Sequence, residues 1–228
     1  MRRAFKWLTA AVVVVVLVLA GFIAWFIFGS RVPGKPKLSV TANTRGGPRT
    51  PDGSWHIVRG KNVFVGYRIK ELFGDAILKR DTVGQAPAVS GTLAIARDRV
   101  TTAVVTADLT HLGSDRAARD AYVRDHTLET GTFPRARFTL TTPIALPAQP
   151  TKGKAFPGLR ATGRLLLHGV THPITFTLDA RWNGPTIDVV GSAPIVLGDY
   201  RIKPPHNVIA DVDDHGFVEL DLTFAPGG

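Results

Sequence analysis

Apolar residues recur at every second position through most of the chain after Trp55, and this period of two is what most constrains the fold. Two segments show it clearly. Their apolar positions are Val63, Val65, Tyr67 and Ile69 in the first, and Ile174, Phe176, Leu178, Ala180 and Trp182 in the second. Successive side chains of a β-strand point to opposite faces, so each segment predicts a strand with one apolar and one polar face.

Several further segments fit the same pattern, and Gly and Pro residues separate them. They are Thr92 to Ile95, Val100 to Leu109, Arg137 to Ile144, Gly163 to His168, Ile187 to Val190 and Phe217 to Phe224. Many strands with short connections and few helical crossovers predict an all-β fold, either an antiparallel sandwich or a closed barrel. A barrel of about eight strands can hold one small ligand or be filled by its own side chains. The alternation fits both cases.

One interval, after Leu112, has the character of a helix. Its apolar stripe consists of Ala117, Ala118, Ala121 and Tyr122. Ser114 or Asp115 is expected to cap the helix, and Asp120 to pair with Arg124 one turn later. We predict a short helical insertion that packs across the end of the sheet or barrel.

Two histidines four residues apart, in the stretch RLLLHGVTHPITFTL, raise the question of a metal site. On a helix such a pair shares one face, but Gly169 and Pro173 disfavour a helix here. The pattern predicts instead a hairpin in which residues 170–173 form the connection. The chain has no cysteine and this stretch has no carboxylate to complete a ligand set, so we expect neither a metal nor a cofactor.

Other possible sites are incomplete. Asp211 to Gly216 begins like a calcium loop, but the twelfth position, which must be a bidentate carboxylate, is Leu222. We expect a hairpin turn there. No serine lies in a G-x-S-x-G elbow and no phosphate-binding loop is present. The sequence therefore predicts no catalytic site, although a hydrolase without a motif stays open.

The basic excess of the chain is confined to its beginning. Lys and Arg number 28 against 18 Asp and Glu, but residues 1–50 contain eight basic residues and no acidic one. The rest of the chain is close to neutral. A nucleic-acid-binding module would carry its basic patch within the folded part, so we expect no nucleic-acid partner.

The run from Ala10 to Phe28 has 19 residues and no charged side chain. As a helix it would be roughly 28 Å long, close to the thickness of the bilayer core. A cleaved signal peptide is the alternative, because Val18-Leu19-Ala20 fits the cleavage preference. The apolar residues that continue after Gly21 favour an uncleaved single-pass anchor.

This anchor divides the chain into three parts. Residues 1–28 form the predicted transmembrane segment, and residues 29–53, rich in Gly, Pro and basic residues, are typical of a linker. The linker either rests on anionic lipid head groups or is a solvated spacer. Residues 54–228 form the predicted barrel, which we expect outside the cytoplasm at the bacterial cell membrane.

Several motifs in a fixed order resemble the YceI-like family of bacterial polyisoprenoid-binding, lipocalin-like proteins. They are Ser54 to Ile57, Arg119-Asp120, Leu128 to Thr130, Thr132 to Phe138, Gly163 to Ile174 and Asp199 to Pro205. The resemblance spans about residues 54 to 225. It implies an antiparallel eight-stranded barrel with a long apolar tunnel for an isoprenoid or similar amphiphile, and no catalysis. Two features depart from the family pattern: Leu128 to Pro134 lacks paired phenylalanines, and Leu78 to Ser90 looks like an added loop.

The alternation also predicts which side chains face the interior of such a tunnel. They are Val65, Tyr67, Ile69, Leu93, Ile95, Phe138, Leu140, Leu165, Leu167, Ile174, Phe176, Leu178, Leu220 and Leu222. A register error of one residue would turn a whole strand outward. The Arg119-Asp120 pair is interpreted as an ion pair that fixes the helix to the barrel. The expected function is to hold an isoprenoid, quinone or fatty amide, and the alternative is an envelope interaction module with a packed barrel.

Overall fold

The computed structural model describes residues 13–21, 32–39, 44–73, 78–147, 150–206 and 210–227. The chain divides into two units, Met1–Pro33 and Gly34–Gly228. In the first unit residues 13–21 are helical. Within the described residues no helix is both long enough and apolar enough to cross a membrane. The other residues of the predicted anchor, 10–12 and 22–28, lie outside the described ranges.

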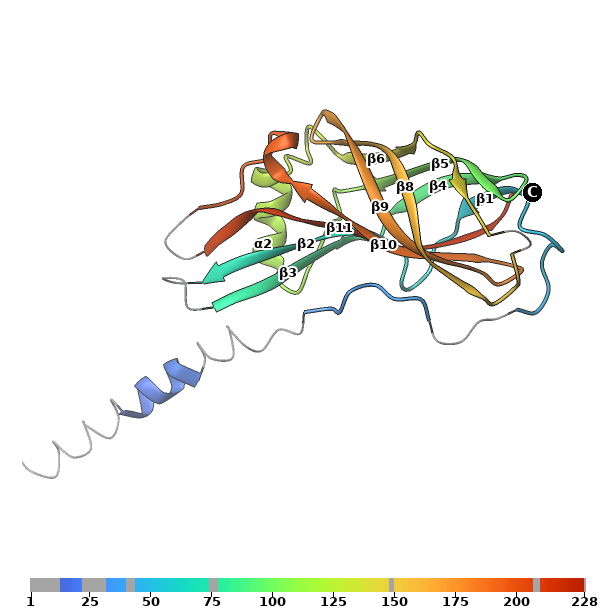
Figure 1. Ribbon diagram of the computed structural model, residues 1–228. Helices are drawn as coiled ribbons and strands as arrows, with labels where there is room; N and C mark the ends of the chain where they lie inside the picture. Colours follow the sequence, from blue (N-terminus) through green and yellow to red (C-terminus); the bar gives the residue numbers. More distant parts are fainter. Residues whose placement is uncertain are drawn as a thin grey trace, which may run out of the picture. The chain divides into compact units, whose positions relative to one another are not determined.

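The second unit is built almost entirely from strands (Figure 1). In chain order they are β1 (Gly53–Ile57), β2 (Phe64–Phe73), β3 (Leu78–Ala86), β4 (Val89–Ile95), β5 (Arg99–Asp108), β6 (Arg135–Leu140), β7 (Ile144–Ala145), β8 (Ala155–Leu167), β9 (Val170–Trp182), β10 (Ile187–Val196) and β11 (Ala210–Pro226). Helix α2 (Ala117–Tyr122) continues into the π-helical segment η1 (Val123–Thr127), and a 3₁₀ turn, η2 (Leu197–Tyr200), follows β10.

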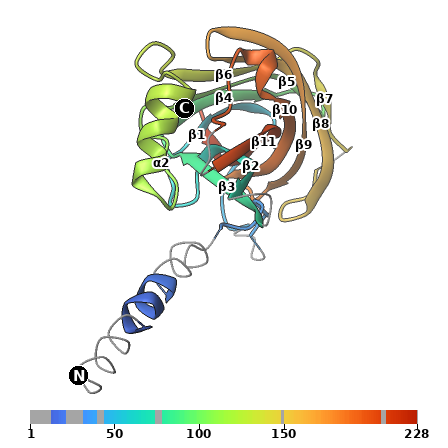
Figure 2. The same ribbon diagram turned by 90° about the vertical axis from the view of Figure 1, so that its left-hand side faces the viewer.

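Eight strands close into an antiparallel barrel. Their order is β1, β4, β5, β6, β8, β9, β10 and β11, and β11 pairs with β1 to complete the ring. Figure 2 shows the barrel viewed along its axis, with α2 at one side of the ring between β3 and β6. The structure confirms the predicted closed antiparallel barrel with a small helical part. We call the end that carries α2 the helix end and the opposite one the far end.

The β2–β3 hairpin extends one side of the barrel at the helix end. β11 is long enough to pair with β1 near residue 225 and with β2 from residue 210 to 221. β3 pairs with β2 along its full length, from Val65 with Ala86 to Phe73 with Leu78. The interpretation of Leu78 to Ser90 as an added loop is therefore wrong. Polar residues such as Arg80, Asp81 and Gln85 obscured the strand in the sequence.

The helix contacts differ from those predicted. Arg116 is the N-cap residue and provides no side-chain cap. The Asp120 carboxylate instead accepts hydrogen bonds from the backbone N–H (2.9 Å) and the hydroxyl of Ser114. Arg124 donates to the carbonyl of Leu112 (2.7 Å), and Arg119 pairs with Glu71 of β2 at 3.6 Å. Arg119 therefore does fix α2 to the barrel, but its partner on the barrel is Glu71 and not Asp120.

The β8–β9 hairpin turns two residues earlier than predicted. His168 and Gly169 form the turn, with φ angles of 49° and 73°. Positive φ at both central residues is what a tight two-residue hairpin requires, and glycine adopts it without strain. Pro173 lies inside β9 opposite Arg164. β9 tolerates this proline because β10 pairs with β9 only from Thr177 to Trp182. The backbone N–H that Pro173 lacks would therefore have no partner on the β10 side.

The acidic stretch from Asp211 to Gly216 is part of β11 and is not the hairpin turn that we predicted. The pairing register with β2 shifts between Val212 and Gly216. Such a bulge inserts unpaired residues and increases the twist of the strand. The Gly and the acidic residues thus mark an irregularity within one long strand.

The outer face of β9 and β10 is partly covered by the chain that precedes the barrel. Arg181 is only 5% exposed although it alternates with inward residues. Its guanidinium donates to the carbonyl (2.7 Å) and the hydroxyl (2.8 Å) of Ser39 and lies 3.4 Å from Asp188. Lys35 lies over the Phe217 ring, with its ammonium 5.5 Å from the ring centroid. Part of the predicted linker therefore packs against the barrel wall.

Replacing Asp221 with asparagine is expected to stabilise the protein at neutral pH. Burial, together with the nearby Asp188 carboxylate, raises the pKa of Asp221 from 3.8 to about 6. The folded state therefore binds this proton more tightly than the unfolded state, and the resulting stability is lost as the pH rises from about 4 through about 6. A shift of this size is worth at most about 3 kcal/mol, and screening at a half-buried site reduces it to about 1 kcal/mol.

Thermal unfolding at several pH values measures this effect. D221N should melt several degrees higher than the wild type at pH 7.5 and at the same temperature near pH 4. The control is D98N, because Asp98 is exposed in the turn between β4 and β5. An equal gain at both pH values would contradict the titration of Asp221 as the cause.

Candidate ligand-binding site

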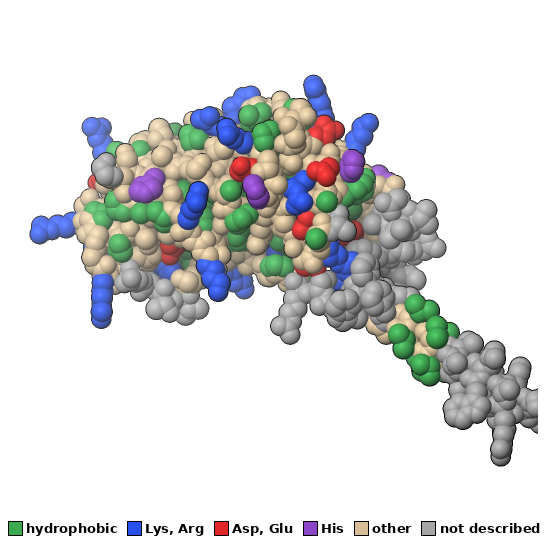
Figure 3. Space-filling view, turned by 180° about the vertical axis from the view of Figure 1, so that it is seen from behind, with side chains coloured by type: hydrophobic (Ala, Val, Ile, Leu, Met, Phe, Trp, Pro, Cys, Tyr) green, Lys and Arg blue, Asp and Glu red, His purple; other side chains and the backbone are tan. Residues whose placement is uncertain are grey.

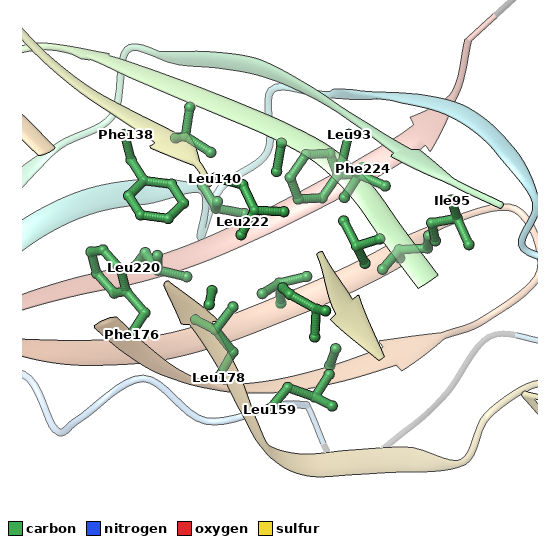
Figure 4. A pocket seen from close by; sticks show the side chains of 18 of the residues that line it. Leu93, Ile95, Phe138, Leu140, Leu159, Phe176, Leu178, Leu220, Leu222 and Phe224 are labelled. Atoms are coloured by element: carbon green, nitrogen blue, oxygen red, sulfur yellow. The ribbon is translucent and has the colours of Figure 1, made fainter. Parts of the chain in front are cut away.

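The far half of the barrel encloses an apolar cavity of about 130 Å³. Side chains from seven of the eight barrel strands surround it, together with Pro51 just before β1 and Val65 of β2, and every residue that lines it is apolar. Figure 4 shows Leu93, Phe138, Phe176, Leu178 and Leu220 directed into this space from strands β4, β6, β9 and β11. Water would find no hydrogen-bond partner among these side chains, so the space suits hydrocarbon.

Aromatic rings shape the wall of this far cavity. Phe138 and Phe176 pack edge to face, with their centroids 5.3 Å apart. The Phe138 ring lies against the backbone of Gly163, where an added Cβ would come within 2.5 Å of it. Gly163 thus leaves room for the Phe138 ring beside β8.

The helix end encloses a second cavity, of about 250 Å³. Its wall is apolar over most of its area, from residues such as Ile69, Leu109 and Ile202. Unlike the far cavity it also carries charged and hydroxyl side chains. These are Arg68, Glu71, Thr82, Arg119 and Thr127, together with the phenol of Tyr67.

The polar side chains of this helix-end cavity form a connected network. Thr82 donates to the Glu71 carboxylate (2.7 Å), which also faces Arg119 at 3.6 Å. Arg119 further contacts Asp115 and donates to the hydroxyl of Ser114 (2.9 Å). Burial raises the pKa of the neighbouring Tyr67 to about 12, although Arg119 acts in the opposite direction. The Tyr67 phenol is therefore neutral at physiological pH.

The two cavities meet in the middle of the barrel. Val65, Ala136, Leu165 and Val218 line both of them. Three of these are branched apolar side chains, and Ala136 is the smallest group at the junction. Together the cavities extend along the barrel from the far end to the region beneath α2.

The structure places the predicted inward-facing residues on these walls, with one exception. Ile174 is buried in the core but lines neither cavity. Leu93, Ile95, Phe138, Leu140, Phe176, Leu178, Leu220 and Leu222 line the far cavity, Tyr67, Ile69 and Leu167 line the helix-end cavity, and Val65 and Leu165 line both. Their contact with a ligand remains a prediction.

Sequence reasoning missed two groups of wall residues. The first consists of apolar residues such as Ala103 in β5, Leu146 after β7 and Leu159 beside the irregularity in β8, which the alternation could have identified in part. The second is the polar network, because Glu71 and Thr82 are polar and the prediction of wall residues selected only apolar side chains. Glu71, an acidic residue at an inward position of β2, was the available signal for a polar group inside the barrel. Its basic partner Arg119 is remote in the sequence, so the pair could not be predicted.

The histidines of the β8–β9 hairpin contact the chain around Tyr200. His168 Nδ1 lies 3.1 Å from the carbonyl oxygen of Tyr200, and the ring packs on Phe133 with centroids 4.5 Å apart. The His172 ring lies 5.4 Å from the Tyr200 ring. In the described part of the chain no three His, Asp or Glu side chains are grouped as metal ligands would be.

Charged side chains are spread over the surface of the barrel. On the face in Figure 3, Lys and Arg side chains project at separate points among polar and apolar atoms.

Comparison with known families identifies the domain. The model of the YceI-like domain matches residues 58–224. The chain belongs to the YceI-like family. Solved structures share its fold at low sequence identity. A polyisoprenoid binding domain from Saccharophagus degradans has 16% identity and a TM-score of 0.57, with 76% of this chain and 98% of that chain covered.

A second solved structure, BcnA from Burkholderia cenocepacia, has 18% identity to this YceI-like protein and a TM-score of 0.52. The alignment covers 69% of this chain and 95% of that chain. No curated protein matches the sequence significantly. At these identities the solved structures establish the barrel fold of the YceI-like domain.

Proposed function

We propose that this YceI-like protein binds a long-chain lipid, an isoprenoid, quinone or similar amphiphile, inside its barrel. The observation that carries the proposal is the pair of cavities that meet at Ala136 and run along the barrel. Burial of hydrocarbon supplies about 0.8 kcal/mol for each methylene group removed from water. A wall with few polar groups contributes little selectivity along the chain of the ligand.

The family and fold support the same ligand class. The Saccharophagus degradans structure with this fold is a polyisoprenoid binding domain. An elongated isoprenoid would suit two cavities joined end to end better than a compact ligand would. The function proposed is binding without catalysis, since the chain has none of the nucleophile or metal motifs considered above.

We further propose that residues 10–28 tether the protein to the bacterial cell membrane as a single-pass anchor, with the barrel outside the cytoplasm. The support is the length and apolar composition of this run. Contact of Ser39 with Arg181 suggests that part of the connecting segment belongs to the barrel. The usable tether would then be shorter than residues 29–53.

Organic extraction of the detergent-purified full-length protein, followed by mass spectrometry, tests the lipid proposal. The wild type should release a stoichiometric amphiphile. F176D, which places a carboxylate in the far cavity, should release none. T177D is the matched control, because Thr177 is the exposed neighbour of Phe176 on β9 and T177D should retain the lipid.

Circular dichroism must show that F176D keeps its β-sheet. If F176D does not fold, F176S serves in its place, since a hydroxyl is a smaller perturbation than a charge. Extracts without lipid from folded wild-type protein, before and after incubation with long-chain quinones and polyprenols, would overturn the proposal.

A further inference from the structure

We infer that the ligand binds in a single orientation, with its head group in the helix-end cavity and its hydrocarbon in the far cavity. The head group is neutral and accepts hydrogen bonds, as a carbonyl does. This inference rests on the proposed function, because it concerns the same ligand. It specifies the chemistry of the head group and excludes a phosphate or diphosphate.

The contrast between the two cavities sets the direction. All residues that line the far cavity are apolar. The helix-end cavity carries the network of Glu71, Thr82 and Arg119. A polar head group in the far cavity would lose its hydrogen bonds to water without replacement, which costs about 1–3 kcal/mol or more. The same head group beside Arg119 would find partners.

The helix-end cavity has hydrogen-bond donors in excess. Arg119 Nε and Thr127 Oγ1 are buried, and neither has a hydrogen-bond partner among the described residues. An arginine N–H can only donate, and a hydroxyl can donate as well as accept. Buried polar atoms are rarely left unpaired in folded proteins. After small side-chain rotations both groups could donate to an acceptor that enters the cavity.

Charge balance argues against an anionic head group. Glu71 and Asp115 both face Arg119, and Asp120 is the next residue of α2. The other cation of this cavity, Arg68, is paired with Glu219 at 2.7 Å and with Asp81 at 3.3 Å. A phosphate would therefore enter a region whose cations are already neutralised, and the adjacent carboxylates would repel it. A carbonyl brings no charge that needs a counterion.

Tyr67 offers a further donor to such a head group. It lines the helix-end cavity, and its ring lies over Gly84 on the opposing strand, where an added Cβ would come within 2.3 Å of it. The raised pKa of Tyr67 keeps its hydroxyl protonated. The lining thus presents a phenol, a guanidinium and a threonine hydroxyl as donors.

Binding of three probes with related branched tails to the full-length protein in detergent tests the inference. The probes are geranylgeranylacetone, which has a ketone head, geranylgeranyl phosphate, and phytane, which has no head group. The affinity of each is measured from quenching of tryptophan fluorescence, since Trp182 lines the far cavity. We expect the ketone to bind about fivefold to tenfold more tightly than phytane, the magnitude of one or two neutral hydrogen bonds, and the phosphate to bind more weakly than the ketone.

Two variants distinguish hydrogen bonding from a structural role. T127V removes one donor at nearly constant shape, and R119K removes Nε while keeping the charge opposite Glu71. Each should lower the ratio of ketone to phytane affinity by about threefold to tenfold without changing phytane binding. T171V, at an exposed position of β9, should leave the ratio unchanged.

The outcomes separate the two proposals. Binding of phytane without preference for the ketone, tighter binding of the phosphate, or an unchanged ratio in both T127V and R119K would overturn the head-group inference and leave lipid binding intact. Failure of all three probes to bind would overturn lipid binding itself, and the head-group inference with it.

Discussion

Replacement of Ala136 with phenylalanine is expected to weaken binding of a long isoprenoid at least about 100-fold while the barrel stays folded. Ala136 lines both cavities and is only 8% exposed, so a phenyl ring would occupy the junction between them. A ligand confined to one cavity would leave several methylene groups unburied. At about 0.8 kcal/mol each, the loss of four methylene groups exceeds the 2.7 kcal/mol that corresponds to 100-fold.

Titration with isoprenoid quinones of increasing tail length measures this effect. A136F should bind a tail of two isoprene units nearly as well as the wild type and lose affinity as the tail lengthens. The matched control is A94F, because Ala94 alternates with the inward Leu93 and Ile95 on β4 and points away from the cavity. Equal affinity of A136F and the wild type for long tails would show that the ligand does not pass Ala136.

The second large effect is expected from the ion pair between Arg68 and Glu219. Arg68 Nε and Nη2 donate to the two carboxylate oxygens of Glu219 at 2.7 and 3.1 Å. Both residues are almost fully buried, at 6% and 2% exposure. E219L removes the carboxylate that both Nε and Nη2 of Arg68 bind in a poorly solvated site, while Asp81 stays 3.3 Å from Nη1. Loss of one partner from a buried pair costs about 3–5 kcal/mol, which lowers the melting temperature by roughly 10 °C.

The double variant R68M/E219L tests whether the cost arises from the buried Arg68 charge that has lost Glu219. It should recover most of the stability lost in E219L, because two apolar side chains leave no buried charge to solvate. Urea unfolding of the wild type, both single variants and the double variant gives the coupling free energy. A double variant less stable than E219L would instead indicate that the pair stabilises the barrel by its own attraction.

The alternation of apolar residues was sufficient to predict the barrel wall. In β2, β9 and β11 the side chains of Tyr67, Phe176 and Leu222 point inward as their spacing requires. A one-residue shift would have exposed an entire apolar face, so the hydrophobic pattern determines the register strongly. The short helix after Leu112 was predicted from an apolar stripe at helical spacing.

Other elements followed long-range contacts that no local pattern reveals. β3 has polar residues on both faces, and it is a strand because β2 lies beside it from Val65 to Phe73. Arg181 and Glu219 look like surface residues in the sequence, yet both are buried because side chains or segments remote in the sequence cover them. The pairing of Arg119 with Glu71 instead of Asp120 likewise depends on where α2 packs.

The sequence by itself determined that this chain forms an antiparallel all-β fold and which side chains face its interior, because a strand period of two is a local property of the backbone. Closure into a barrel was implied by the family resemblance and is shown by the pairing of β11 with β1. The tertiary structure decided that the interior holds two adjacent cavities and that only one of them carries charged and hydroxyl side chains. That outcome depends on where side chains such as Phe138, Ala136 and Arg119 lie relative to one another across the barrel. The free volume and the charge inside the barrel are set by side chains from several strands, so no single stretch of sequence reveals them.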